Sequence, residues 1–254
     1  NGTTGYEEAA CQGLMAGINA HLCIEEKEPL VLNRAEAYIG VLIDDLTTKG
    51  VQDPYRMFTS RAEYRILLRQ DNADFRLTPI GHQLGLISEE RILALEKKYK
   101  KQNDIIQYLQ EHQISPSEIN EYLEKQETPI LTQKIKMGSL LLRPQVNLTE
   151  IVKHSKSLQQ FLNHLETADE VLENAEIAIK YESYIKKEEE LADKMKQLDH
   201  IKIPKEINYK EIPSLSLEAR DKLSKVQPQN LGQASRISGV NPSDIAILMI
   251  LINK

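Results

Sequence analysis

Arginine is unevenly distributed along this chain of 254 residues. Five of the ten arginines fall within a window of 21 residues: Arg56, Arg61, Arg65, Arg69 and Arg76. A guanidinium group can contact a phosphate through two parallel hydrogen bonds and can stack on a base, whereas a lysine offers only a point charge. Arg61, Arg65 and Arg69 are four residues apart, so a helix here would place them in one stripe. This window is the strongest nucleic-acid footprint in the chain.

The same window also contains aromatic and acidic residues. The aromatic side chains in or beside it are Tyr55, Phe58 and Tyr64. The acidic ones, which could neutralise the arginines in internal ion pairs, are Glu63, Asp71 and Asp74. The spacing therefore leaves two interpretations open, phosphate binding and internal ion pairing.

Small and hydroxyl side chains open the chain. Thr4 and Glu7 have the Thr-x-x-Glu spacing of a capping box, which predicts a helix from here to about His21. Backbone N–H groups, two hydroxyls and the positive end of the helix dipole would then meet at Gly2–Gly5, an arrangement that suits a phosphate or another anion. Many capped helices carry no ligand, so the pattern by itself favours a structural role over a cofactor site.

Asp44 and Asp45 are the best candidates for a pair of catalytic carboxylates. Adjacent residues of a helix point about 100° apart, so we expect two surface carboxylates rather than an acid–base pair. No Ser/His/Asp or Cys/His set is identifiable, and the six histidines lack the short spacings to His or Cys that zinc sites use. The sequence predicts no metal site.

The segment Gly232–Ser243 reads like the first helix and turn of a helix-turn-helix. A DNA-binding protein is therefore an alternative. The helix that follows, Asp244–Leu251, has almost no polar side chain that could reach base edges, as a recognition helix must. We interpret it as buried core.

The composition is that of a globular chain, with 41% hydrophobic residues and a net charge of -6, which argues against a surface covered in phosphate-binding charge. No run approaches the roughly 20 apolar residues of a membrane span. Cys11 and Cys23 lie among small and apolar residues, which predicts buried, unpaired thiols and a cytoplasmic setting. The first residues contain neither an initiator methionine nor a signal peptide, so we expect the chain to be truncated at its start.

The elements that must position these residues are predicted to be mostly helices. Residues 35–48 form a second helix in this prediction, further helices begin after Ser88 and Ser115, and residues 172–198 form one long amphipathic helix. Beyond residue 203, prolines separate short helices. Small residues line one side of the first helix and suit close packing on a sheet outside this chain: Ala9, Gly13, Ala16, Gly17 and Ala20.

Five long motifs occur in a fixed order along almost the whole chain. They are Asn1–Ala10, Glu36–Leu46, Pro54–Arg65, Asp71–Asp74 and Gly232–Val240. Together they closely resemble the MnmG/GidA family of tRNA uridine 5-carboxymethylaminomethyl modification enzymes.

The resemblance implies a mostly α fold, in which a helical C-terminal region follows the last helix of an FAD-binding α/β domain. Four segments are expected. Residues 1–28 would be the C-terminal edge of the FAD-binding domain, and residues 29–86 an arginine-rich connecting segment. Residues 87–202 would form a helical domain with the long amphipathic helix, and residues 203–254 a small helical subdomain.

The resemblance also implies an activity and partners. The family enzyme is a homodimer that works with a GTPase partner and modifies C5 of the tRNA wobble uridine, using FAD, NADH and methylenetetrahydrofolate. The residues expected beside the flavin are Gly2, Thr3, Thr4, Gly5 and Tyr6. Arg56 and Arg65 match arginines engaged with tRNA, and Arg61 and Arg69 join them by spacing. Glu218 falls on a position implicated in function, with an undefined role.

The Gly-rich phosphate loop of a dinucleotide-binding fold lies outside this sequence, so we expect the chain alone to bind tRNA and partners without catalysing a reaction. One competing class is an interaction module that binds only the GTPase, its arginines locked in ion pairs. Another, less favoured, is a DNA-binding helix-turn-helix protein. Contact with tRNA should weaken steeply with salt, because counterions are released, whereas docking through apolar helix faces should not.

Overall fold

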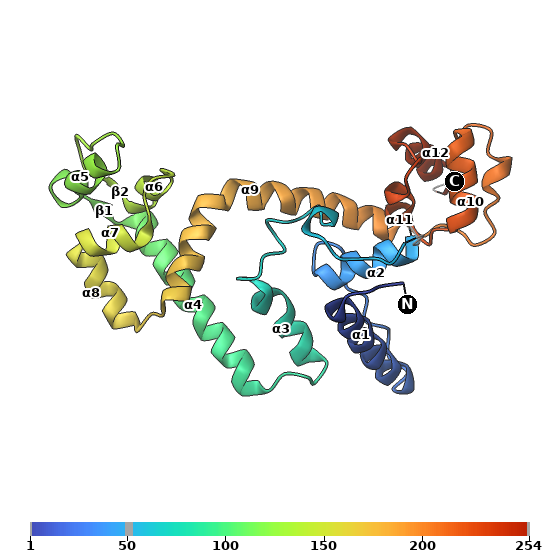
Figure 1. The fold of residues 1–254 in the computed structure, drawn as a ribbon, viewed down its shortest axis with the longest axis horizontal. Helices are drawn as coiled ribbons and strands as arrows, with labels where there is room; N and C mark the ends of the chain where they lie inside the picture. Colours follow the sequence, from blue (N-terminus) through green and yellow to red (C-terminus); the bar gives the residue numbers. More distant parts are fainter. Residues whose placement is uncertain (1, 49–52, 253–254) are drawn as a thin grey trace. The chain divides into compact units, whose positions relative to one another are not determined.

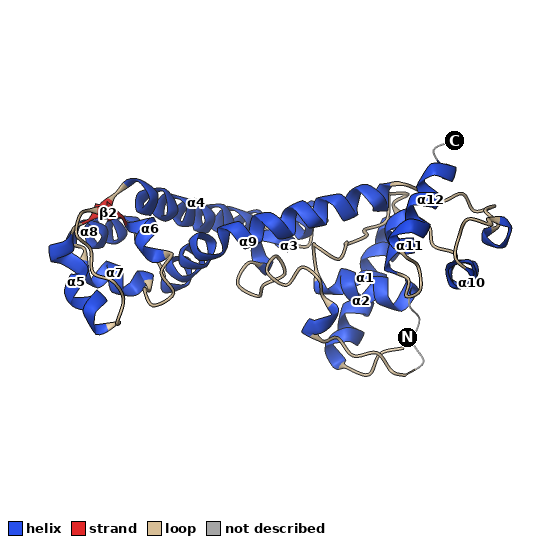
Figure 2. Ribbon diagram, turned by 90° about the horizontal axis from the view of Figure 1, so that it is seen from above, coloured by secondary structure: helices blue, strands red, loops and turns tan. Residues whose placement is uncertain are grey.

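The computed structural model describes residues 2–48 and 53–252, and these are mostly helical (Figures 1 and 2). They contain twelve α-helices, two short 3-10 helices and one two-stranded sheet, which confirms the mostly α fold class. The chain divides into two compact units. The first comprises Asn1–Arg69 and Lys187–Lys254, and the second comprises Gln70–Lys186. The boundaries of the four segments predicted from the sequence are placed by motifs, whereas the two units are defined by contacts. The four segments therefore remain a prediction.

The amino-terminal part of the first unit contains three helices. They are α1 (Tyr6–Ile24), α2 (Tyr38–Thr48) and the 3-10 helix η1 (Thr59–Arg61). The predicted capping box is wrong: α1 begins after Gly5, because the Thr4 N–H donates to Tyr55 O and draws Thr4 into a backbone pairing. Glu8, in the first turn of α1, is buried.

The small-residue side of α1 is exposed in this chain. A Cβ added to Gly13 or Gly17 would meet no heavy atom of the described residues within 4 Å, apart from the helix's own backbone. Packing of this side on a sheet stays a prediction. The two thiols of α1 are unpaired, but Cys23 is exposed and Cys11 only partly buried, so the predicted burial is wrong.

The second unit is a helical domain with one small sheet, and the beginning of the long helix α9 belongs to it. Its helices are α3 (Ala73–Gln83), α4 (Glu89–Glu111), α5 (Pro116–Lys125), α6 (Met137–Leu141), α7 (Leu148–His154), α8 (Lys156–Leu165) and the first part of α9 (Asp169–His200). Strands β1 (Gln113–Ile114) and β2 (Ile135–Lys136) pair antiparallel. Fully buried side chains of the core include Ile105, Leu109, Ile119, Leu123, Leu140 and Ile151.

Local sequence explains two features of this unit. Helix α5 begins after Ser115 with Pro116 at its first position, as the sequence predicts, and Ser115 and Glu118 form a capping box there. Lys98 of α4 joins two other helices, because its ammonium group donates to Asp74 of α3 and Glu170 of α9.

The carboxyl-terminal part of the first unit is a small bundle around the end of α9. It contains η2 (Tyr209–Glu211), α10 (Leu217–Val226), α11 (Leu231–Arg236) and α12 (Pro242–Ile252). Asp244 fixes two helix starts at once: its carboxylate accepts from the backbone N–H groups of Ser216, before α10, and Asn241, before α12. One carboxylate therefore joins the residues that precede α10 and α12.

The last helix, α12, buries one face. Ile245 and Leu248 lie in the core, whereas Ile250 and Leu251 are 60% and 43% exposed. The predicted core role is confirmed for the buried face only. The exposed residues are apolar and offer no hydrogen-bonding group to a base edge, which argues against a DNA-recognition helix.

Candidate nucleic-acid interface

The arginine window does not form a helical stripe. Between Tyr55 and Gln70 only Thr59–Arg61 is helical, as a single 3-10 turn, and the rest forms turns, bends and irregular backbone, whereas Arg76 lies in α3. The stripe predicted from the four-residue spacing is therefore absent from Arg61, Arg65 and Arg69. Tertiary contacts hold the segment instead: Glu188 of α9 accepts from the backbone N–H groups of Ile66 and Leu67 at 3.0 and 3.1 Å.

Arg61 is held in a fixed orientation at the surface. Its Nε donates to Arg56 O at 2.8 Å, and its Cζ lies 4.3 Å from the centre of the Tyr55 ring. Its own carbonyl accepts from Arg34 Nη2 at 3.0 Å. An arginine that is stacked on an aromatic ring and bound at Nε by a backbone carbonyl is organised in advance for contact with a phosphate.

The other arginines of the window differ in their surroundings. Arg56 is exposed and lies 3.5 Å from the Glu8 carboxylate, and Arg65 is exposed at a turn. Arg69 folds back to donate to the carbonyl of its own turn. Arg76 belongs to the second unit, where its Nε donates to Asn72. The structure therefore brings Arg56 and Arg61 together in one surface segment.

The predicted cofactor segment Gly2–Tyr6 lies directly beside the arginine window. Tyr55 N donates to Gly2 O at 2.6 Å, and Thr4 N donates to Tyr55 O at 3.3 Å, in a parallel bridge. Gly2, Thr4 and Tyr6 are exposed, Thr3 accepts from Gln12 and Gly5 is buried. Two segments that lie about 50 residues apart in the sequence are thus paired in one structural feature.

Glu8 joins the same two segments through its side chain. It is 5% exposed, and its Oε1 accepts from Met57 N at 2.8 Å. The hydrogen bond from Met57 is the main cause of its lowered pKa, so the carboxylate is charged. A Cβ on Gly5 would lie 1.6 Å from Glu8 Oε2. A negative charge therefore already occupies the start of α1, which makes this helix end unsuitable for a phosphate.

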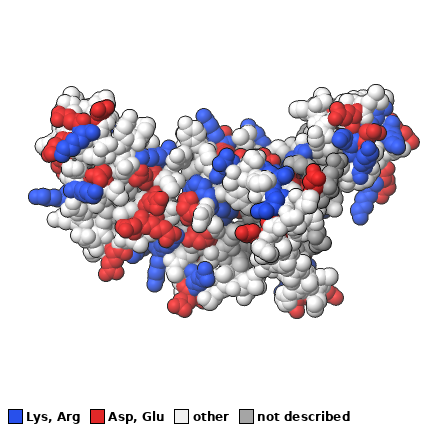
Figure 3. All heavy atoms as spheres, in the orientation of Figure 1, with Lys and Arg blue, Asp and Glu red and all other residues white. Residues whose placement is uncertain are grey.

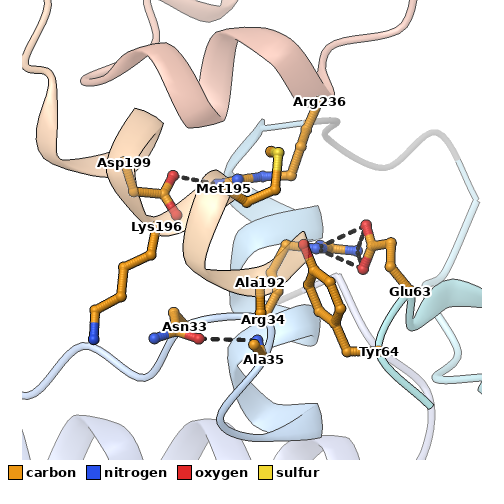
Figure 4. A pocket seen from close by; sticks show the side chains of 10 residues that line it. All are labelled: Asn33, Arg34, Ala35, Glu63, Tyr64, Ala192, Met195, Lys196, Asp199 and Arg236. Atoms are coloured by element: carbon orange, nitrogen blue, oxygen red, sulfur yellow. Dashed lines mark hydrogen bonds and ion pairs between the residues drawn. The ribbon is translucent and has the colours of Figure 1, made fainter. Parts of the chain in front are cut away.

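Arg34 is the centre of a buried ion cluster behind the arginine window (Figure 4). Its Nη1 donates to Asp45 at 2.7 Å and to Asp44 at 3.0 Å, while Nε and Nη2 donate to Glu63. Asp45 is 1% exposed, so the prediction of two surface carboxylates is wrong. Both carboxylates accept from Arg34 Nη1, so a single buried guanidinium draws the two adjacent side chains together.

Burial and hydrogen bonding shift two pKa values in this cluster. Burial alone would lower the pKa of Arg34, but hydrogen bonds to Glu63 and Asp45 outweigh it and raise the value, so the guanidinium stays charged. Burial, and then the hydrogen bond that Tyr55 Oη donates to Asp45 at 2.9 Å, raise the pKa of Tyr55. The ring beneath Arg61 is therefore a neutral phenol.

Arg236 of α11 completes the cluster from the C-terminal bundle. Its Nε and Nη2 donate to the two oxygens of Asp44 at 2.9 and 3.0 Å, and Nη2 also donates to Asp199 at 3.2 Å. A cavity of about 140 Å³ lies beside these groups, and Figure 4 shows Tyr64 and Met195 on its walls. Both guanidinium groups that line it are paired with carboxylates, so it does not suit a phosphate.

Charges of both signs are mixed over the face drawn in Figure 3, in keeping with the net charge of -6. A nucleic-acid contact must therefore rest on local geometry rather than on a broad basic surface. Among the described residues, no His, Cys, Asp and Glu side chains gather in a group that could hold a metal ion. None of the described helices combines the length and apolar character needed to cross a membrane.

Glu218 lies in the first turn of α10, away from the arginine window in sequence. It is exposed, and its carboxylate lies against Gly239, where a Cβ would be 2.4 Å from Oε1. Gly239 has φ +94°, a conformation that side chains rarely adopt. The turn after α11 and the start of α10 thus form one exposed feature, with Leu217 79% exposed beside it.

Three residues of this site are absent from the predicted set: Glu8, Arg34 and Arg236. Glu8 and Arg236 lie inside motifs quoted for the family resemblance, but their types alone suggest surface charges. Arg34 is an isolated arginine between two predicted elements, and nothing in its local sequence indicates burial. The sequence does show an acidic pair on one helix and isolated arginines elsewhere. It does not specify which of these charged groups contact one another.

Comparisons with known proteins cover most of the chain. Residues 1–28 match the family model described as glucose inhibited division protein A. Residues 89–189 match the tRNA modifying enzyme MnmG/GidA C-terminal helical domain, and residues 191–254 match the C-terminal helical bundle of the same enzyme.

Curated relatives and solved structures agree with these models. The tRNA uridine 5-carboxymethylaminomethyl modification enzymes MnmG of Christiangramia forsetii and Flavobacterium psychrophilum are 52% and 51% identical over 254 residues. Each match covers 100% of this chain, which spans 41% of the relative's length. Aquifex aeolicus GidA in its form II crystal matches with a TM-score of 0.78 and 42% identity, over 100% of this chain and 39% of that one. The chain belongs to the MnmG/GidA family and corresponds to its C-terminal helical part.

Proposed function

We propose that this chain is the tRNA- and partner-binding part of an FAD-dependent enzyme. The enzyme adds a carboxymethylaminomethyl or aminomethyl group to C5 of the tRNA wobble uridine. The names of the curated relatives support tRNA uridine as the substrate. Arg56, Arg61, Arg65 and Arg69 are the proposed tRNA-binding residues, and the described geometry favours Arg61 as the central one.

The observation that carries this proposal is the backbone pairing of Gly2–Thr4 with Tyr55. Arg61 lies on the Tyr55 ring, so a phosphate bound by Arg61 would be close to the segment expected beside the flavin. An enzyme that modifies a base must hold the backbone of its RNA near the cofactor, because orientation contributes much of the rate. The pairing provides that proximity within one structural feature.

The amino-terminal segment fits FAD only in part. Gly2, Thr4 and Tyr6 are exposed and can offer backbone N–H and hydroxyl groups. The Glu8 carboxylate at the start of α1 repels phosphate, so the pyrophosphate of FAD must be bound elsewhere. We therefore assign this segment a contact with an uncharged part of the cofactor, and most of the FAD site to residues outside this chain.

The remaining parts of the proposal come from the family. They are NADH and methylenetetrahydrofolate as co-substrates, a homodimer, a GTPase partner and a cytoplasmic setting. Exposed apolar side chains of the C-terminal bundle, Leu217, Ile250 and Leu251, are suited to protein docking. On its own the chain is expected to be catalytically inactive.

The test is tRNA binding by the purified chain, followed by fluorescence anisotropy over a salt series. Arg61→Ala should weaken binding several-fold and reduce the slope of log K against log salt by roughly 0.7 to 0.9, the contribution of one phosphate contact. Arg91→Ala removes an exposed arginine of α4 and is the matched control, with no expected change. Helical circular dichroism should be the same for all three proteins.

Two outcomes would contradict the proposal. Equal binding by the parent and the Arg61 variant would remove Arg61 from the interface. Absence of any salt-dependent binding would favour the alternative of a module that docks only the GTPase. The ion pairs on which that alternative depends engage Arg34 and Arg236, and within the window Arg56 pairs with Glu8. This part of the alternative is therefore met by Arg56.

A further inference from the structure

The buried ion cluster connects the C-terminal bundle to the arginine window through a continuous series of hydrogen bonds. Arg236 of α11 forms a two-pronged pair with Asp44, 192 residues away in sequence. Asp44 Oδ2 also accepts from Arg34 Nη1 at 3.0 Å. Arg34 Nη2 in turn donates to the carbonyl oxygen of Arg61 at 3.0 Å. Arg236, Asp44, Arg34 and Arg61 are therefore linked in this order, each hydrogen-bonded to the next.

A second branch reaches the same arginine. Arg34 Nη1 donates to Asp45 at 2.7 Å, and Asp45 accepts from Tyr55 Oη at 2.9 Å. The Tyr55 ring is the surface on which the Arg61 guanidinium lies. The cluster thus fixes Arg61 both at its backbone carbonyl and under its side chain.

The contacts are shielded from water. The exposed fraction of the side chain is 13% for Arg236, 13% for Asp44 and 6% for Arg34. A buried charge that loses its partner is not compensated by solvent and must find another protein group. Loss of the Arg236 guanidinium would leave Asp44 to draw on Arg34 alone.

The charge balance makes that redistribution unavoidable. Two guanidinium groups, of Arg34 and Arg236, face four carboxylates, of Asp44, Asp45, Glu63 and Asp199. With Arg236 removed, Arg34 would be the remaining partner of Asp44, in addition to Asp45 and Glu63, and Asp199 would lose its guanidinium partner. Repulsion between the neighbouring carboxylates of α2 would rise, and the hydrogen bond from Arg34 to the Arg61 carbonyl competes with them for the same group.

We propose that Arg236 is a positioning residue for RNA binding, which acts through Asp44 and Arg34 to set the orientation of Arg61. This inference rests on the proposed function and concerns how the orientation of the proposed tRNA-binding residue Arg61 is controlled. A displacement of α11 in the bundle would be transmitted to the phosphate-binding arginine, although α11 itself contacts no RNA in this arrangement.

The experiment is a double-mutant cycle on tRNA affinity in the 254-residue chain, with the variants Arg61→Ala, Arg236→Ala and both together. If Arg236 acts through Arg61, we expect Arg236→Ala to weaken binding about 3- to 10-fold, and to cause less than about a 2-fold further loss once Arg61 is alanine. A residue that only stabilises the fold would lower affinity in both backgrounds. Lys222→Ala, which removes an exposed cation from the same bundle, is the control for charge and should bind like the parent.

Each result has one meaning. Unchanged affinity in Arg61→Ala would refute the proposed function itself. A loss in Arg61→Ala with none in Arg236→Ala, or losses that multiply in the double variant, would overturn the positioning role alone.

A milder variant covers the case in which Arg236→Ala does not fold. Asp199→Asn removes the negative charge that faces Arg236 Nη2 and leaves the pair of Arg236 with Asp44 intact. It should reduce affinity less than about 3-fold and only while Arg61 is present. A greater loss in the Arg61→Ala background than in the parent background would overturn the positioning role.

Discussion

Substitution of Gly40 by alanine tests how firmly the loop that carries Arg34 is placed. Gly40 is buried in the first turn of α2, and a Cβ there would lie 2.3 Å from Asn33 O and 2.5 Å from Leu32 O. Ordinary contact begins at 3.4 Å, so the loop or the helix must retreat by about 1 Å. Alanine normally stabilises a helix by about 0.8 to 1.0 kcal/mol relative to glycine. Here we expect a net destabilisation of about 1 to 3 kcal/mol, the range for overpacking.

The matched control is Gly13→Ala in α1, where no heavy atom beyond the helix's own backbone lies within 4 Å of the new Cβ. That variant should be stabilised by up to about 1 kcal/mol. The chain has no tryptophan, so urea unfolding is best followed by far-UV circular dichroism, with separate transitions fitted if the two units unfold independently. Stabilisation by both substitutions would refute the close approach of Asn33 to α2. Since Arg34 follows Asn33, Gly40→Ala should also weaken tRNA binding, whereas Gly13→Ala should not.

Two further predictions concern buried carboxylates. Asp45→Ala should destabilise the chain by about 2 to 4 kcal/mol in the same urea experiment, somewhat less than a fully broken buried pair, because Arg34 keeps two other carboxylates. Burial alone would raise the pKa of Asp244, but hydrogen bonds from Ser216 and Asn241 lower it below its ordinary value of 3.8. Its contribution is therefore complete above that value and is lost as pH falls through the lowered folded pKa. Asp244→Asn turns one accepting oxygen into an NH2 group that faces other donors, so it should cost about 1 to 3 kcal/mol at pH 7. Unfolding curves at a series of acidic pH values should show the difference from the parent shrinking below about pH 4.

The sequence predicts the helices of the second unit well because their signals are local. Ser115 and Glu118 specify the start of α5 within four residues, and the apolar spacing over residues 172–198 predicts most of α9. The start of α1 is less predictable, since Thr4 is removed from its capping position by a hydrogen bond to Tyr55, far along the chain. Local patterns determine an element where no distant partner competes for the same groups.

The candidate site shows the opposite behaviour. The segment around Arg61 and Arg65 has helical charge spacing, yet Glu188 binds the N–H groups of Ile66 and Leu67 from α9, more than 100 residues away. From the sequence, Asp44 and Asp45 are expected at the surface. Only the structure shows that Arg34 pairs with both of them and that Arg236 pairs with Asp44. The sequence could identify the arginines as functional candidates, but their geometry depends on pairings that no spacing encodes.

A buried ion cluster is a poor choice for stability alone, since well-packed apolar residues of similar volume are often as stabilising or more so. What charged groups provide, and apolar groups do not, is direction: a guanidinium must align its N–H bonds with its acceptors. In this chain that direction is passed on to Arg61, whose backbone carbonyl and underlying ring are both tied to Arg34 or its partner Asp45. A mobile surface arginine would lose side-chain entropy on binding a phosphate, whereas one that is already oriented loses much less. We therefore interpret the cluster as the support of the proposed tRNA-binding residue Arg61, and we expect substitutions in the cluster to affect tRNA binding more than stability.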